Sequence, residues 1–107
     1  MGCQPRNEQA PPAPAPVRVA WTRRAVGDLA RLHDFLATVN PRAAARVVQS
    51  LAAVPSRLVE QPRIGERLEE HEPREVRRLF VGKYEIRYEV RDSDIFILRV
   101  WHAREAR

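Results

Sequence analysis

Apolar and polar residues repeat with two different periods, which divide the chain into a helical half and a strand-forming half. Residues 17–21 alternate and are rich in β-branched and aromatic side chains, which predicts a short first strand. After Thr22, a suitable N-cap, apolar residues recur three or four positions apart and predict a helix with one apolar stripe, comprising Ala25, Leu29, Leu32, Leu36 and Val39. Asn40 and Pro41 suit the start of a second helix, which we expect Pro55 to kink or end.

Beyond a turn at residues 61–65 and a charged stretch, the pattern changes to a period of two. Residues 77–81, 84–90 and 95–101 are predicted strands, of which 84–90 alternates most clearly, and turn sequences at 82–83 and 91–94 separate them. The order β-α-α-β-β-β predicts an α+β fold, in which an antiparallel helical hairpin packs on one face of a small antiparallel β-sheet. We expect the last three strands to form a meander that the N-terminal strand joins.

The first 16 residues contain five prolines and almost no large apolar side chain. Such a segment buries too little surface to offset the entropy of ordering, so we predict a disordered tail at 1–16 and a folded domain at 17–107. The lone cysteine, Cys3, excludes an internal disulfide and makes the cytoplasm the expected compartment. No apolar run approaches the roughly 20 residues that span a bilayer, so no membrane association is expected.

The chain of 107 residues has a net charge of +5, and all its basic residues except Lys83 are arginines. Two interpretations stay open. The bias towards arginine reflects codon usage in a GC-rich genome, or it marks a surface that binds phosphate or carboxylate groups, which the planar guanidinium contacts with two parallel hydrogen bonds. The excess of positive charge lies towards the C-terminal third of the chain.

The three histidines give no sign of a metal site or of a cofactor. His33, His71 and His102 are far apart in the sequence and lack cysteine partners at ligand spacing. His102 ends the last strand beside Trp101, where an imidazole is a plausible general acid or base. In the alternative interpretation, Trp101 packs on the core and His102 is simply a polar residue at the end of a strand.

Arginines on the preceding strands offer His102 phosphate-binding neighbours, namely Arg77, Arg78 and Arg87. Against this interpretation, Arg87 shares its face with Glu85 and Glu89. We therefore expect a solvated, salt-bridged and nearly neutral sheet face, which is poorly suited to nucleic acid. Tyr84 and Tyr88 alternate onto the opposite, apolar face and are expected in the core.

Several short elements, taken in order, resemble a known family across about residues 17–105. They are Trp21-Thr22, Asp28-Leu29, Asn40-Pro41, Leu58, Pro62, Gly65, Arg77-Arg78-Leu79, Tyr84-Glu85-Ile86-Arg87-Tyr88 and Val100-Trp101-His102-Ala103-Arg104-Glu105. This pattern resembles the RelE/ParE superfamily of type II toxin–antitoxin toxins, particularly its ParE-like branch. The fold of that superfamily, a helical hairpin on a small antiparallel sheet, agrees with the fold that the residue pattern predicts.

The resemblance implies a growth-inhibiting toxin, of the kind linked to plasmid stabilization, that a cognate acidic antitoxin neutralises in a hetero-oligomer. ParE-like members bind and poison DNA gyrase without being enzymes, whereas RelE-like members cleave mRNA on the ribosome. Glu85 stands where the RelE branch carries a functional arginine, and the chain stops at Arg107, before any terminal tyrosine. Both departures favour the gyrase-directed activity.

Candidate site residues follow from the two activities. If the protein is an mRNA endonuclease, the catalytic candidates are His102, Arg78 and Arg87. In either case, the candidates for binding the target or a phosphate are Arg77, Arg78, Arg87 and Arg104. The antitoxin is expected to place an amphipathic helix or extended segment on an exposed apolar face of the helical hairpin or in a groove of the sheet.

Overall fold

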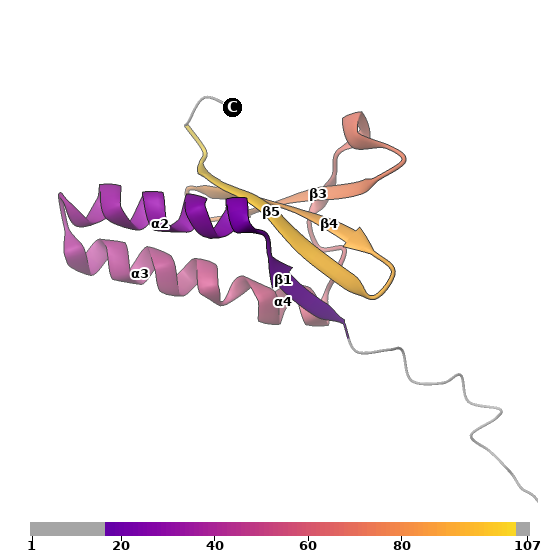
Figure 1. The fold of residues 1–107 in the computed structure, drawn as a ribbon, viewed down its shortest axis with the longest axis horizontal. Helices are drawn as coiled ribbons and strands as arrows, with labels where there is room; N and C mark the ends of the chain where they lie inside the picture. The colour runs from indigo at the N-terminus through magenta and orange to yellow at the C-terminus, as the bar shows by residue number, and fades with distance from the viewer. Residues whose placement is uncertain (1–16, 105–107) are drawn as a thin grey trace, which may run out of the picture.

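Three helical segments and five strands form the fold in the computed structural model, which describes residues 17–104 (Figure 1). The elements are β1 (Arg18–Trp21), α2 (Arg23–Ala37), α3 (Pro41–Ala52), α4 (Val54–Glu60), β2 (Glu66–Arg67), the 3-10 turn η1 (Glu69–His71), β3 (Glu75–Val81), β4 (Tyr84–Arg91) and β5 (Asp94–His102). The tail predicted to be disordered, residues 1–16, lies outside the described residues, as do residues 105–107.

The sheet has the strand order β1-β5-β4-β3-β2. Strands β3, β4 and β5 form the predicted antiparallel meander, which confirms the α+β class. The sheet as a whole is mixed rather than antiparallel, because β1 runs parallel to β5. Two parallel neighbouring strands need a long connection, which the helices and the first strands of the meander supply. The residue pattern of a short strand does not indicate whether it pairs in parallel or antiparallel. The two-residue strand β2, beside β3, was not predicted.

Local capping explains where the helices begin. The side-chain oxygen of Thr22 accepts a hydrogen bond from Ala25 N at the start of α2. Asn40 accepts from Arg42 N and Ala43 N at 3.1 and 3.2 Å, and Pro41 occupies the first turn of α3. The second helical segment is interrupted at Ala53, and α4 begins with Pro55 in its first turn, as expected for a proline that has no N–H to donate.

The Asn40 cap provides a first test of these local interactions. Replacement of Asn40 by alanine leaves two helix N–H groups without their side-chain acceptor, and we expect the free energy of unfolding to fall by about 1 kcal/mol. Urea denaturation followed by circular dichroism measures the change. Ser50→Ala, an exposed change within the same helix, is the matched control and should cost nothing. An equal effect of both substitutions would contradict the capping role.

The core lies between the helical hairpin and one face of the sheet, here called the inner face. In the cross-strand register, Leu79, Ile86 and Val100 form one row of this face. They pack in one cluster with buried helical residues, Ala25, Leu32, Leu51, Val54 and Leu58. Tyr88 is fully buried in that cluster and Tyr84 packs against it, which confirms the prediction that both tyrosines belong to the core side.

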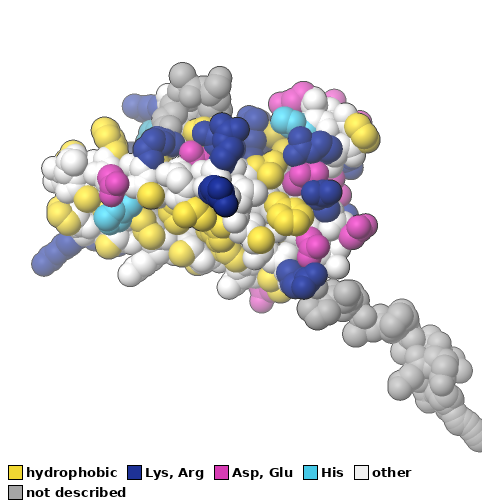
Figure 2. Space-filling view, viewed as in Figure 1, with side chains coloured by type: hydrophobic (Ala, Val, Ile, Leu, Met, Phe, Trp, Pro, Cys, Tyr) yellow, Lys and Arg dark blue, Asp and Glu magenta, His cyan; other side chains and the backbone are white. Residues whose placement is uncertain are grey.

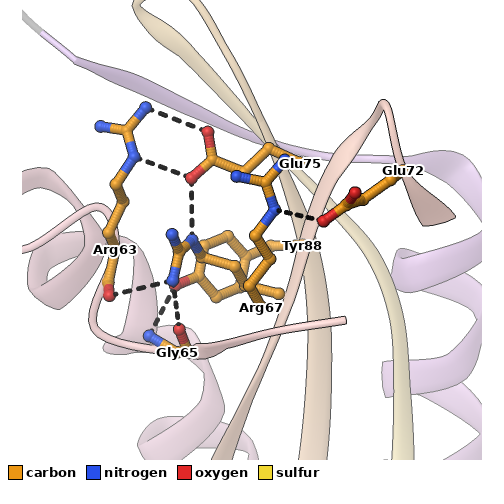
Figure 3. A network of polar contacts seen from close by, with 7 residues as sticks. Arg63, Gly65, Arg67, Glu72, Glu75 and Tyr88 are labelled. Carbon is orange, nitrogen blue, oxygen red and sulfur yellow. Dashed lines mark hydrogen bonds and ion pairs between the residues drawn. The ribbon is translucent and has the colours of Figure 1, made fainter. Parts of the chain in front are cut away.

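A polar network fastens the loop before β2 to the sheet (Figure 3). Arg63 and Arg77 both bind the Glu75 carboxylate, at 2.7 and 2.8 Å. Burial by itself raises the pKa of Glu75, but the hydrogen bonds and charges of these two guanidinium groups outweigh it and leave the pKa below its ordinary value. Arg77 also donates to Gly65 O at 2.7 Å, while Gly65 N donates to the Tyr88 hydroxyl at 2.9 Å.

Candidate functional site

Three arginines lie side by side across the face of the sheet that points away from the core, here called the outer face. The cross-strand register pairs Arg78 of β3 with Arg87 of β4, and Arg87 with Arg99 of β5. The structure therefore brings together two of the predicted residues, Arg78 and Arg87. It adds Arg99, which the sequence analysis missed.

A β-bulge explains why Arg99 belongs to this row. Tyr88 pairs with Ile97 whereas Arg87 pairs with Arg99, so Leu98 is an extra residue in β5. The bulge moves Arg99 to the face opposite Ile97, although residues two apart in a regular strand share a face. The Thr22 hydroxyl donates to the carbonyls of Ile97 and Leu98, at 2.8 and 3.2 Å. These hydrogen bonds connect the bulge to the start of α2. Residues 95–101 are all apolar except Arg99, so the sequence pattern does not indicate the bulge.

Each arginine of the row already has a carboxylate partner. Arg78 binds Glu66 at 2.9 Å and Arg87 binds Glu85 at 3.0 Å. The prediction of a salt-bridged face is thus correct, but the prediction that it is solvated is wrong, because Glu85 and Glu89 are both buried. Glu85 has 0% exposure because its cross-strand neighbours are the large side chains of Phe80 and Trp101.

Arg99 pairs with a carboxylate from the helical layer. Asp28 of α2 accepts from Arg99 Nε at 2.7 Å and from Val100 N at 3.0 Å. Burial alone raises the pKa of Asp28, but these hydrogen bonds, with the charges of Arg99 and Arg31, lower it below its ordinary value. Asp28 therefore ties α2 to the middle of β5 as a buried carboxylate that stays ionised.

Trp101 is buried, as the alternative interpretation expected, but it lies on the outer face, apart from the cluster between the helices and the sheet. Its side chain pairs across the sheet with Glu85 and is only 8% exposed. The guanidinium carbons of Arg87 and Arg99 lie 5.0 and 4.9 Å from the Trp101 ring centroid, within the range of cation–π attraction. The indole is thus covered by two of the arginines in the row.

Beside this row lies a cavity of about 520 Å³, here called the basic groove. The groove is lined by residues from the start of α2, from η1 and from the sheet: Thr22, Arg23, Arg24, His71, Val76, Arg87, Leu98, Arg99 and Trp101. In the space-filling view, dark-blue side chains gather over the first turn of α2, with apolar side chains between them and the acidic part near η1 (Figure 2). Arg23 and Arg24 were not among the predicted site residues.

His102 faces a different part of the molecule. It pairs with Tyr84, on the inner-face side, and the two rings meet edge to face with centroids 5.3 Å apart. With Arg104, it lines a second cavity of about 440 Å³, here called the terminal pocket, together with Arg31, Leu32, Phe35, Leu36 and Tyr84. Arg104 N donates to His102 Nδ1 at 3.1 Å.

The predicted arginine cluster around His102 therefore does not form. Successive residues of a strand point to opposite faces, so His102 and Trp101 diverge, as do Arg77 and Arg78. Arg77 is occupied by Glu75 and by the carbonyls of Arg63 and Gly65. Of the predicted residues, Arg78 and Arg87 share the outer face, Arg104 accompanies His102, and Arg77 lies apart, bound to Glu75 and Gly65.

Two further findings concern the described part of the chain. Within residues 17–104, no three His, Cys, Asp or Glu side chains are grouped so as to hold a metal ion. None of the helices in that range is both long and apolar enough to cross a membrane.

Comparison with known proteins places the chain among toxins of type II toxin–antitoxin systems. Residues 19–107 match the family model described as the ParE toxin of the type II toxin–antitoxin system, parDE. The toxin RelE2 of Caulobacter vibrioides is 37% identical over 86 residues, which cover 80% of this chain and 94% of that protein.

Solved structures share the fold. The chromosomal ParDE system of P. aeruginosa matches with a TM-score of 0.68 and 24% identity over 81% of this chain and 96% of that one. The RelBE2 complex of Mycobacterium tuberculosis matches with a TM-score of 0.57 and 27% identity over 82% of this chain and 99% of that one. The fold and the matches define a toxin of the RelE/ParE superfamily. Within it, the chain belongs to the ParE toxin family of type II toxin–antitoxin systems.

Proposed function

We propose that this toxin arrests growth by binding and poisoning DNA gyrase in the cytoplasm, and that it is not a nuclease. The observation that carries the proposal is the separation of the candidate acid–base group from the arginine row: His102 lies on the inner-face side, and Arg78 and Arg87 lie on the outer face. A nuclease needs both kinds of group within reach of one phosphate.

The charge of the outer face supports the same proposal. Phosphate binding draws on cations that no neighbouring acid opposes, yet Arg78, Arg87 and Arg99 each hold a carboxylate. Glu85 is buried among them, at the position where the resemblance to the RelE branch calls for a functional arginine. Such a face is better suited to a protein partner than to catalysis on RNA.

An assay of gyrase tests the proposal directly. Purified toxin should inhibit supercoiling by gyrase holoenzyme and accumulate gyrase–DNA cleavage complexes, and addition of the antitoxin should reverse both effects. Unaffected supercoiling at saturating toxin would overturn the proposal.

A ribosome-dependent mRNA endonuclease is the second candidate. It is favoured by the alignment of three arginines beside Trp101 and by the similarity to a protein named RelE2. The roles that the sequence predicts for that activity are His102 as general acid or base and Arg78 and Arg87 on the phosphate, although these residues lie on opposite faces of the sheet.

Substitution of His102 distinguishes the two candidates. On the gyrase proposal, induced His102→Ala toxin should arrest growth as fully as the wild type, and 5′-end mapping should find no new ends in translated mRNAs. His33→Ala, an exposed histidine in α2, is the matched control. Loss of toxicity in His102→Ala alone, together with loss of toxin-dependent mRNA cuts, would favour the nuclease.

We also propose that an acidic antitoxin covers the terminal pocket. Phe35, at its mouth, is 68% exposed, and Val39 at the end of the hairpin is 80% exposed. Arg31 and Arg104 flank this apolar surface. The combination is suited to an amphipathic acidic helix, and the similar RelBE2 structure is itself a toxin–antitoxin complex.

A further inference from the structure

The basic groove and the terminal pocket differ in chemical character. The terminal pocket has an aromatic and aliphatic wall formed by Leu32, Phe35, Leu36 and Tyr84. The groove has four arginines around a small apolar floor of Val76, Leu98 and Trp101. Both surfaces suit a segment with acidic and apolar side chains, but the groove has four arginines where the terminal pocket has Arg31 and Arg104.

The charges of the groove are distributed unevenly. Arg87 and Arg99, inside the groove, are compensated by Glu85 and Asp28. Arg23 and Arg24, at its rim, are exposed, and within residues 17–104 neither has a carboxylate at ion-pair distance. The groove thus has two arginines without a carboxylate partner, Arg23 and Arg24, beside its apolar floor. Within that floor, Trp101 contacts the guanidinium groups of two other arginines.

We propose that the basic groove is the surface that holds the toxin's target, through an acidic polypeptide segment of gyrase that places an apolar side chain on Leu98, beside Trp101. This inference rests on the proposed function and adds to it the surface and the kind of segment. Carboxylates of the segment bind Arg23 and Arg24, which the fold leaves available, and the apolar anchor covers the floor between them and the sheet.

Charge complementarity favours a polypeptide over a nucleic acid in this groove. A strand of nucleic acid gains its affinity from many phosphate contacts, and here two of the four lining arginines already have carboxylate partners. An acidic peptide needs only a few charge-assisted hydrogen bonds and one buried anchor, which this groove supplies.

Charge reversal at the rim tests the inference without threatening the fold. Arg23 and Arg24 are the first two residues of α2, where an acidic side chain interacts favourably with the helix dipole. We therefore expect Arg23→Glu/Arg24→Glu toxin to keep the melting temperature of the wild type while its affinity for gyrase holoenzyme falls by about tenfold or more. Surface plasmon resonance at fixed ionic strength measures the affinity, and the supercoiling assay measures the effect on activity.

Arg42→Glu is the matched control, because Arg42 is the second residue of α3, as Arg24 is of α2, and lies outside the groove. It should bind gyrase as the wild type does. The double variant should also keep its affinity for the antitoxin, which we assign to the terminal pocket.

The possible outcomes separate this inference from the proposed function. Wild-type toxin that neither binds nor inhibits gyrase refutes the proposed function and, with it, this assignment. Wild-type toxin that binds gyrase, together with a double variant that binds equally well, refutes the groove alone. The groove assignment is also overturned if the double variant loses affinity for a short single-stranded RNA, or for the antitoxin, while its affinity for gyrase is unchanged.

Discussion

Replacement of Asp28 by asparagine is expected to lower the free energy of unfolding by about 2–4 kcal/mol. The carboxylate is buried, holds Arg99 through two hydrogen bonds and accepts from the backbone N–H of Val100. An amide keeps the shape but loses the charge and brings an NH₂ group towards these donors. The expected cost is below that of a fully buried ion pair, because the Arg99 side chain is 29% exposed and recovers some hydration.

The same substitution should change the pH dependence of stability. The pKa of Asp28 is lower in the folded protein than in the unfolded chain, so its ionised form stabilises the fold above the unfolded pKa of about 4. That contribution is lost as the pH falls through the folded pKa. Urea denaturation at a series of pH values should therefore show a shallower loss of stability on the acid side for Asp28→Asn than for the wild type.

Asp34→Asn is the matched control, since Asp34 lies on the same helix with its side chain 84% exposed. Its stability and acid dependence should stay close to those of the wild type. Equal unfolding midpoints for the two variants at neutral pH would show that Asp28 does not anchor α2 to β5.

Replacement of Gly65 by alanine should be comparably destabilising, by about 2–4 kcal/mol, for a steric reason. A Cβ atom at this position would stand 2.6 Å from the carbonyl oxygen of Arg78 and 2.8 Å from the Tyr88 hydroxyl. The backbone oxygen cannot turn aside, so β2 must move away from β3. That movement also breaks the buried hydrogen bond from Gly65 N to Tyr88 and the bond from Arg77 to Gly65 O.

Gly27→Ala is expected to raise the stability that Gly65→Ala lowers, in the same unfolding assay. A Cβ at Gly27 meets nothing within 4 Å, and the residue is exposed within α2. We expect a gain of up to about 1 kcal/mol from the higher helix propensity of alanine. Thermal and urea unfolding of both variants compares them directly, and a Gly65→Ala protein as stable as Gly27→Ala would disprove the close approach.

Part of the candidate site followed from the sequence and part did not. Arg78 and Arg87 were identified because they lie in two consecutive predicted strands, and the structure brings them together. Residues 95–101 of β5 are all apolar except Arg99, so their pattern does not indicate the bulge at Leu98 that adds Arg99 to this row. The sequence also did not predict the burial of Glu85. A charged residue in an alternating strand indicates a solvated face unless large neighbours cover it.

Short-range interactions are what the sequence by itself determined: the two periods, the caps at Thr22 and Asn40, the break at Pro55 and the meander of three strands. Each depends on residues a few positions apart. The tertiary structure decided the direction of β1, the separation of His102 from the arginine row and the pairing of Asp28 with Arg99, which are 71 residues apart. These features depend on which segments meet in space, and that is set by packing of the whole chain and not by any local preference.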